Sequence, residues 1–385
     1  MSTSEPLPRY VMIGGFLGAG KTTAVDQFAR ELTGRGLRVG LITNDQSIGL
    51  VDTALLRSHG FAVEEITGGC FCCRFESLNH AADQLTRQTR PEVFVAEPVG
   101  SCTDLLATVS YPLRRIYGNR FRIAPLSVLV DPIRASRVLS LVDGRAFSPK
   151  VRYVYRKQLE EADFIVVNKC DDITQELRNR LVEELHRQFP QAEVFSVSAK
   201  EGTGLEEWFE RILSEEGATR PTMELDYDLY AEGEAQLGWL NATISVTAPE
   251  PFDGNELLLR LAEGLRKEIV AQDGEIAHLK MTLDSHGPMD QLSVISLVDN
   301  DAEPDLRESL LDHVDGGSLI LNLRVELPPE TLSAIVASVL DAENQLGYRI
   351  TLTSEHEEHF RPARPTPTHR VEVSKPTSSR SPGKP

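Results

Sequence analysis

The sequence is short of positive charge. Its 385 residues include 40 Lys and Arg against 58 Asp and Glu, which gives a formal net charge of −18 with neutral histidines. A surface that follows the phosphates of nucleic acid or of an anionic membrane needs clustered Lys and Arg. The composition therefore argues against a nucleic-acid binder and against a protein of an anionic membrane surface.

Long apolar runs are also missing. The sequence contains no stretch of about eighteen apolar residues, the length that crosses a bilayer, and no signal-peptide pattern at its N-terminus. The expected location is the cytoplasm.

Cysteine is scarce and unevenly placed. There are five, and three of them fall within the run GGCFCC. An odd number with this clustering is typical of a reduced compartment and of a metal or thiol site, and it does not suit a disulfide framework.

The chain is long enough for two hydrophobic cores, so we expect two domains. Short apolar runs alternate with helical patterns over residues 1–214, which predicts an α/β domain with a doubly wound parallel sheet. Residues 215–235 are polar and predict a linker. Residues 236–360 predict a smaller α+β domain in a split βαβ, ferredoxin-like arrangement, with one extra strand unplaced. Residues 361–385 are rich in Pro, Ser, Thr and basic residues and are expected to be disordered.

A phosphate loop is predicted near the N-terminus. The run GFLGAGKT fits G-x-x-x-x-G-K-[S/T], follows a predicted strand and opens a predicted helix. Glycines there let backbone N–H groups surround the phosphates, Lys21 reaches the β- and γ-phosphates, and the Thr22 hydroxyl binds Mg²⁺. The alternative is a glycine-rich turn with a chance lysine. The predicted nucleotide contacts are Gly15, Gly18, Ala19, Gly20, Lys21, Thr22 and Thr23.

The base of the nucleotide is predicted from a second motif, NKCD, which follows the apolar run DFIVV. The Asp171 carboxylate can accept hydrogen bonds from the N1–H and the exocyclic amine of guanine, a donor pair that adenine lacks. A later run, SAKEG, also follows a strand and is placed to close over the base. These motifs favour GTP over ATP and predict base contacts from Asn168, Lys169, Asp171, Ser198, Ala199 and Lys200.

Two carboxylates end predicted strands at the edge where the phosphates should lie. Glu97 is the candidate for the Mg²⁺ shell, and Asp45, next to Asn44, for contact with Mg²⁺ or the attacking water. With Lys21 they form the predicted catalytic set. The alternative for both carboxylates is a helix cap or a turn.

The cysteine run predicts a metal site. Three thiolates, from Cys70, Cys72 and Cys73, can converge on Zn²⁺ and leave one tetrahedral position for another ligand, and soft thiolates would also hold Cu(I). The alternatives are three small buried side chains, or a redox pair with C-x-x-C spacing. Cys102 and Cys170 stand alone and are interpreted as structural or incidental.

With these residues together, the N-terminal half resembles the CobW-type GTPases, relatives of the UreG and HypB GTPases. The resemblance rests on GGFLGAGKTT, on GGCFCC, on Glu97-x-x-Gly100 and on NKCD. It implies slow hydrolysis of GTP to GDP, coupling of nucleotide state to metal at the cysteines, and nucleotide-dependent homodimers. The run after Asn44 departs from the family pattern N-E-F-G, and the family's His-rich stretch is absent.

The sequence hypothesis is a metallochaperone that uses GTP and Mg²⁺ and delivers a transition metal, with Zn²⁺ favoured, to a client metalloprotein or a cofactor-pathway protein. A second hypothesis is a GTP-dependent chaperone that loads a cofactor, for example a corrinoid, and whose metal site is structural. A third is a redox-sensing GTPase.

Overall fold

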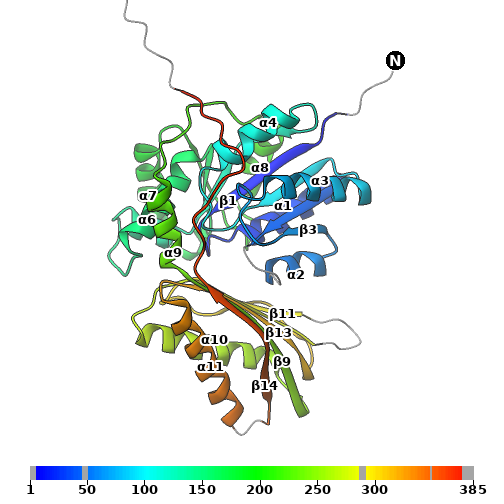
Figure 1. Cartoon of the computed structure of the whole chain (residues 1–385), viewed down its shortest axis with the longest axis vertical. Helices are drawn as coiled ribbons and strands as arrows, with labels where there is room; N and C mark the ends of the chain where they lie inside the picture. Colours follow the sequence, from blue (N-terminus) through cyan, green and yellow to red (C-terminus); the bar gives the residue numbers. More distant parts are fainter. Residues whose placement is uncertain (1–5, 46–50, 286–291, 347–348, 375–385) are drawn as a thin grey trace, which may run out of the picture.

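The structure, a computed structural model, describes residues 6–45, 51–285, 292–346 and 349–374. They form two layered domains, one above the other in Figure 1. Within the described residues, no helix is long and apolar enough to cross a membrane.

The N-terminal domain is built on a parallel sheet. Its strands are β1 (Arg9–Gly15), β2 (Val39–Asn44), β3 (Ala62–Ile66), β4 (Val93–Glu97), β5 (Arg122–Ile123), β6 (Ser127–Val130), β7 (Phe164–Val167) and β8 (Glu193–Ser196). They run in the order β3-β2-β4-β1-β6-β7-β8, with β5 beside β1. The central strands are buried on both faces, which is why they read as continuous apolar runs.

Helices cover both faces of this sheet (Figure 1), and two separate apolar clusters lie on its two sides. The predicted doubly wound α/β domain is confirmed. The helices are α1 (Lys21–Gly34), α2 (Val51–Ser58), α3 (Phe75–Gln88), α4 (Tyr111–Tyr117), α5 (Pro132–Val138), α6 (Pro149–Glu161), α7 (Gln175–Gln188) and α8 (Leu205–Ser214), with a π-helical turn at Leu106–Ser110 and a 3₁₀ turn at Cys170–Asp172.

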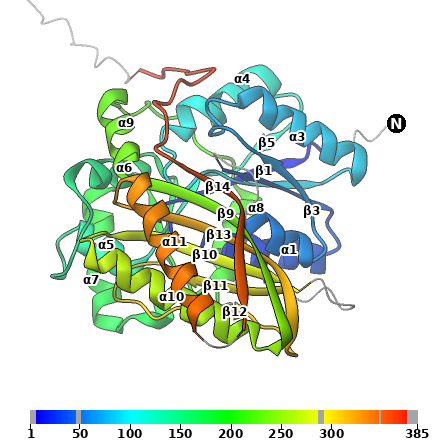
Figure 2. The same cartoon turned by 60° about the horizontal axis from the view of Figure 1, so that its bottom comes forward.

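The second domain is an antiparallel sheet with two helices on one face, α10 (Gly254–Ala271) and α11 (Pro329–Gln345) (Figure 2). Its strands are β9 (Gly238–Phe252), β10 (Ile276–Asp284), β11 (Leu292–Leu297), β12 (Asp305–Glu308), β13 (Val314–Val325) and β14 (Thr351–Phe360). The order β12-β11-β10-β13-β9-β14 contains the predicted split βαβ core, and the unplaced extra strand is β11, which extends the sheet beyond β10.

The two faces of this second sheet differ in polarity because side chains alternate along each strand. Leu279, Met281 and Leu283 of β10 pack in the apolar cluster under the helices. His278 and Lys280, on the other face, line a cavity together with the phosphate loop of the first domain. The second domain therefore covers the phosphate edge of the first with a polar, basic face.

The segment predicted as a linker has regular structure. Helix α9 (Tyr227–Gln236) begins at Asp226, whose side chain accepts hydrogen bonds from Asp228 N and Leu229 N. The helix packs against α6, and its Tyr230 is buried. The sequence reading missed it because its polar and apolar residues show little helical periodicity.

The structure describes the C-terminal tail as far as residue 374, where the sequence predicted disorder from residue 361; the remaining residues of that prediction lie outside the described part of the chain. After β14 the tail returns along the first domain (red in Figure 1). Its backbone bonds to that domain at Cys72, through Thr368, and at Ala107, through Val371.

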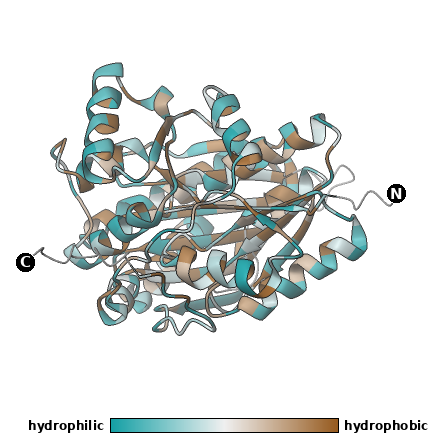
Figure 3. Ribbon diagram, turned by 90° about the horizontal axis from the view of Figure 1, so that it is seen from above, coloured by the Kyte–Doolittle hydropathy of each residue, from teal (hydrophilic) through white to brown (hydrophobic). Residues whose placement is uncertain are grey.

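Figure 3 shows hydrophobic residues concentrated on the interior strands, with hydrophilic residues along the outward sides of the helices. Each domain therefore has its core between its sheet and the helices that cover it. The edge of the parallel sheet that carries the phosphate loop faces the second domain.

Candidate functional site

The phosphate loop joins β1 to α1 at the centre of the parallel sheet. Gly15, Gly18 and Gly20 have positive φ values of 130°, 78° and 86°, a region that favours glycine. A Cβ on Gly15 would lie 2.3 Å from the Leu129 carbonyl oxygen, and one on Gly20 would lie 2.3 Å from Asn168 Nδ2. The glycines predicted for the cradle are therefore required by the backbone path and by close neighbours.

The Lys21 and Thr22 side chains point to a common carboxylate. Thr22 Oγ1 donates to Glu97 Oε1 at 3.1 Å, and Lys21 Nζ lies 4.0 Å from the same oxygen. Burial, and next the charge of Asp52, raise the pKa of Glu97 to about 7. Glu97 Oε2 is buried without a hydrogen-bond partner among the described residues, and a water in a Mg²⁺ shell would satisfy it.

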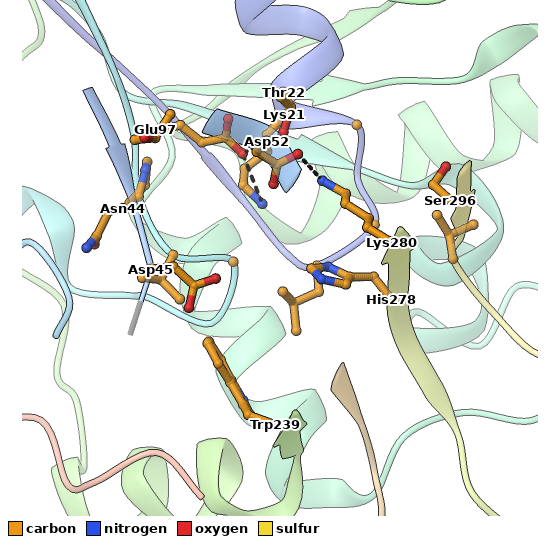
Figure 4. Close-up of a pocket in the computed structure, with 18 of the residues that line it drawn as sticks. Lys21, Thr22, Asn44, Asp45, Asp52, Glu97, Trp239, His278, Lys280 and Ser296 are labelled. Atoms are coloured by element: carbon orange, nitrogen blue, oxygen red, sulfur yellow. Dashed lines mark hydrogen bonds and ion pairs between the residues drawn. The ribbon is translucent and has the colours of Figure 1, made fainter. Parts of the chain in front are cut away.

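A carboxylate that the sequence reading missed, Asp52, lies in the same cavity (Figure 4). It sits in the first turn of α2 and forms an ion pair with Lys280 of the second domain. Burial acts to raise the pKa of Asp52, but the charge of Lys280 and its hydrogen bond lower the pKa below its usual value. Asp52 is therefore an ionised group beside the predicted Mg²⁺ ligand Thr22.

Asp45, the other predicted switch carboxylate, also lines the cavity but is turned to the second domain. Arg324 Nη2, on β13, donates to both Asp45 oxygens at 3.1 and 3.3 Å. The Arg324 side chain is fully buried. In this arrangement Asp45 fastens the second sheet to the end of β2, and its predicted contact with Mg²⁺ or water stays a prediction.

Asn168 of the predicted base motif holds two loops together. Its Nδ2 donates to the Ala19 carbonyl at 2.9 Å, and its Oδ1 accepts from Ala199 N at 2.9 Å. Ser198 Oγ accepts from Glu201 N, which closes the turn of the SAK loop. The structure thus brings the phosphate loop and both predicted base motifs side by side.

The charged residues of the base motifs differ in their surroundings. Lys169 adopts a left-handed conformation with φ of 55° and pairs with Asp131 at 2.9 Å. Lys200 Nζ pairs with Asp305 of the second domain at 3.0 Å. Asp171 is exposed, with its carboxylate open to a ligand from solvent.

The second domain leaves little room above the phosphate loop. The cavity there measures about 40 Å³, and Lys280, His278, Trp239 and Arg307 line it from the second domain. Each buried water needs roughly 10–15 Å³ on this measure, so the space suits a few waters and no triphosphate. For a triphosphate to bind here, the side chains that line the cavity, or the domains that carry them, have to move apart.

The cysteine loop lies between β3 and α3 and gathers three thiols. The Sγ–Sγ distances are 2.8 Å for Cys70–Cys72, 3.2 Å for Cys70–Cys73 and 3.7 Å for Cys72–Cys73. Four sulfurs at 2.3 Å around Zn²⁺ stand about 3.8 Å apart, so a small expansion fits these three to one ion. Gly68 and Gly69, with φ of 73° and 147°, give the turn that makes this convergence possible.

The thiols have unequal pKa values. Hydrogen bonds from the thiols of Cys102, Cys72 and Cys73, in that order of size, hold the pKa of Cys70 well below its ordinary value. The hydrogen bond with Cys70 raises the pKa of Cys73 to about 11. Binding of a metal ion to these sulfurs displaces the protons that they carry.

Asn44 connects this loop to the phosphate edge. It ends β2, lines the cavity beside Asp45, and donates from Nδ2 to Ile66 O at 3.0 Å and to Gly69 O at 2.8 Å. Its Oδ1 accepts from Phe71 N at 3.0 Å. One side chain at the nucleotide edge thus fixes the entry and the centre of the cysteine loop.

The tail covers the loop from outside. Thr366 N donates to Cys73 Sγ at 3.3 Å, and Thr368 bonds to the loop backbone through N and Oγ1. His369 packs edge-on against Phe75 with ring centroids 5.0 Å apart. We call residues 361–374 the strap. Sequence periodicity does not predict the strap, because the strap makes its contacts mainly through backbone groups and with residues far away in the sequence.

Comparison with known proteins gives a family for the first domain. Residues 9–196 match the family described as CobW/HypB/UreG, nucleotide-binding domain. The Escherichia coli (strain K12) protein named zinc chaperone YeiR is 29% identical over 178 residues, 46% of this chain and 50% of that protein. Zinc chaperone CobW of Sinorhizobium sp is 29% identical over 181 residues, 42% of this chain and 50% of that protein. The matches thus span half the length of these relatives.

Some solved structures also resemble this chain. HypB from Helicobacter pylori in complex with nickel has a TM-score of 0.41 at 18% identity and covers 55% of this chain and 91% of its own. The Zn(II)-bound YjiA GTPase from E. coli has a TM-score of 0.36 at 18% identity and covers 87% and 99%. On the sequence match, residues 9–196 of this chain form a nucleotide-binding domain of the CobW/HypB/UreG type.

Proposed function

We propose that this protein is a GTP-hydrolysing metallochaperone. It binds a transition metal at Cys70, Cys72 and Cys73, and we favour Zn²⁺ as that metal. It delivers the metal to a client metalloprotein or a cofactor-pathway protein. The observation that carries the proposal is the Asn44 bridge, because one side chain touches both the nucleotide edge and the thiol loop.

GTP is bound across the loops that Asn168 joins. The glycine loop and the N-terminus of α1 take the phosphates, Lys21 offsets their charge, and Asp171 accepts from guanine. Lys21, at the phosphate end, and Asp171, at the base end, are the decisive contacts.

Mg²⁺ would be held by Thr22, Glu97 and Asp52, directly or through water, and would offset charge on the β- and γ-phosphates. For Asp52 to serve, its ion pair with Lys280 has to break, and for Asp45 to reach the attacking water its bonds to Arg324 have to break. Both ion pairs would break if the binding of GTP displaces the second sheet from the phosphate loop. Hydrolysis then transfers the γ-phosphoryl group to water and leaves GDP.

Nucleotide state is coupled to the metal through β2 and β4. Domain separation frees the end of β2 at Asp45, and the adjacent Asn44 shifts the cysteine loop that it holds. Delivery to a client follows from the change in metal affinity, and a nucleotide-dependent homodimer would add a second surface for that client.

A second candidate is a GTP-dependent cofactor-loading chaperone with a structural metal site. It is favoured by the burial of Cys70 and Cys72, at 6% and 2% exposure, under the strap. A structural ion would leave only on unfolding.

The test is an anaerobic titration of the full chain with Zn²⁺ and Co²⁺, with GDP or with a non-hydrolysable GTP analogue plus Mg²⁺. We expect metal affinity to differ between the two nucleotide states, and Cys72→Ser to lose metal binding while it keeps GTP. Lys21→Ala should lose GTP and keep metal. Tight binding that ignores the nucleotide and does not exchange would instead support the structural site.

A further inference from the structure

The second domain lines the phosphate cavity with polar atoms that lack partners. Among the described residues, the buried atoms Trp239 Nε1, Ser296 Oγ and Arg307 Nε have no hydrogen-bond partner, and all three residues line this cavity. The indole N–H and the guanidinium N–H can only donate, and the hydroxyl can also donate. Buried polar atoms are normally paired, so these donors indicate an acceptor-rich ligand such as a phosphate group.

Arg307 lies at an irregularity of the second sheet. Strand β12 is an edge strand and pairs with β11. The paired residues along β12 are Asp305 with Ser296, Leu306 with Ile295, and Glu308 with Val294. The register shifts there, and Arg307 is the extra residue, as in a β-bulge. Bulges are frequent at sheet edges and next to active sites, where they redirect a side chain.

The Arg307 guanidinium reaches the first turn of α1. Its Nη1 donates to Oγ1 of Thr23, one of the residues predicted to contact the nucleotide. The N-cap residue Gly20 gives this helix no side-chain cap, so N–H groups of its first turn are available to phosphates. The Arg307 side chain is only 22% exposed. Arg307 thus places a positive charge beside the predicted phosphate position, in a site largely shielded from water.

Both neighbours of this arginine along β12 are tied to the first domain. On one side, Asp305 pairs with Lys200 of the SAK loop at 3.0 Å. On the other side, Glu308 lies 3.5 Å from Nε2 of His59, which follows α2. Contacts on both sides of Arg307 therefore fix β12 against the domain that carries the phosphate loop.

The charge of Arg307 is less compensated than that of the other second-domain cation that lines the cavity and was described above. Lys280 forms its ion pair with Asp52 (Figure 4). Arg307 meets a neutral hydroxyl at α1, and its Nε lies 3.5 Å from Asp305 Oδ2 without a hydrogen bond. Asp305 is itself shared with Lys200. The Arg307 guanidinium is therefore the better donor for a phosphate oxygen.

We propose that Arg307 is a catalytic residue that the second domain supplies to the phosphates of GTP, an arginine finger within the same chain. The inference rests on the proposed function and adds a residue that the sequence reading did not single out. GTP enters while the two domains are apart. The second domain then returns and brings Arg307 against the phosphate oxygens, with Ser296 and Trp239 as neutral donors on the same side.

The contact matters most while the phosphoryl group is transferred. The oxygen of a water molecule bonds to the γ-phosphorus, and one proton of that water passes to solvent. The bond from the γ-phosphorus to the β–γ bridging oxygen breaks, and its electron pair stays on GDP. A guanidinium in a shielded site stabilises the negative charge that develops on these oxygens. Loss of Arg307 should therefore lower the rate of hydrolysis much more than the affinity for GTP.

The first test uses the native full chain. GDP, Mg²⁺ and aluminium fluoride together mimic the phosphoryl group during transfer, and a crystal structure of this complex locates Arg307 directly. We expect a guanidinium nitrogen within about 3.2 Å of a phosphate oxygen or a fluoride. A guanidinium that stays on Thr23 or turns to solvent would overturn the inference and leave the proposed GTPase intact.

Single-turnover hydrolysis of GTP tests the residue kinetically. Arg307→Ala should hydrolyse GTP at least about 100-fold more slowly than the native chain and bind a non-hydrolysable GTP analogue within about threefold of the native affinity. Arg307→Lys keeps the charge without the planar fork and should remain at least about tenfold slow. The matched control is Arg266→Ala, which removes a 23% exposed arginine of α10 that pairs with Glu263, and it should hydrolyse GTP at the native rate.

The outcomes separate the two proposals. A native rate in Arg307→Ala would overturn the inference alone. So would a parallel loss of GTP affinity and rate, because it would assign Arg307 to binding or to structure. If the native chain neither binds nor hydrolyses GTP, the proposed function fails and the inference fails with it. The lysine variant and the crystal structure decide the question if the alanine variant does not fold.

Discussion

Lys280→Ala should strengthen the binding of GTP. Lys280 reaches from β10 into the phosphate cavity and pairs there with Asp52, and the two side chains are only 16% and 21% exposed (Figure 4). The pair closes the cavity and occupies a carboxylate that we propose as a Mg²⁺ ligand. Its removal should favour separation of the two domains, the arrangement that we propose binds the nucleotide.

The size of the effect follows from the strength of this pair. A charged hydrogen bond with little exposure is worth about 1.5 kcal/mol, and 1.4 kcal/mol is about tenfold in an equilibrium. Because apparent affinity scales with the fraction of binding-competent protein, the dissociation constant for GTP should fall by up to about tenfold.

Calorimetric titration of GTP analogue plus Mg²⁺ measures this directly. The matched control is Lys267→Ala, which removes an exposed lysine on α10, within the helix layer that covers the apolar face of the second sheet, and should change nothing. If Lys280→Ala weakens GTP binding, Lys280 serves the phosphates in the bound state, and the view of it as a closing contact is wrong.

Three further predictions concern other parts of the molecule. Asn168→Ala removes two hydrogen bonds in a buried place and should lower the free energy of unfolding by about 2–3 kcal/mol in urea titrations while also weakening GTP binding. Burial raises the pKa of Glu161 to about 8, so this group binds a proton more tightly in the folded state and stability should fall as pH rises from about 5 to 8, by at most about 1.4 kcal/mol per unit from this one group. Glu161→Gln should flatten that slope, and an unchanged slope would refute the assignment. Deletion of residues 361–385 should expose the thiol of Cys73 and speed its alkylation in native protein, whereas an unchanged rate would mean that the strap does not shield it.

The candidate nucleotide site could be predicted from local motifs because each motif lies in one short stretch next to a strand end. The position of the run from Gly15 to Thr22, and that of the base motif at Asn168, could be predicted from the strand that precedes each of them. The parallel sheet then brings all such ends to one edge, as their alternation with helices implies.

The residues that were missed come together only through tertiary packing. Asp52 is the second residue of α2, and Lys280 belongs to another domain. Neither has a spacing in the sequence that marks it. The strap was missed for a different reason, because Pro- and Thr-rich composition indicates low apolar burial, and its order comes from backbone hydrogen bonds to an existing surface.

The strap has a consequence for the speed of metal exchange. Because Thr366 N bonds to Cys73 Sγ and Thr368 bonds to the carbonyls of Cys72 and Cys73, we expect an incoming ligand to reach the sulfurs only slowly while the strap is in place. A metal held below it is then protected kinetically, whatever its equilibrium affinity. A client whose backbone bonds to the cysteine loop would displace the strap and uncover the ion at the same time. Metal release would then depend on the binding of that client.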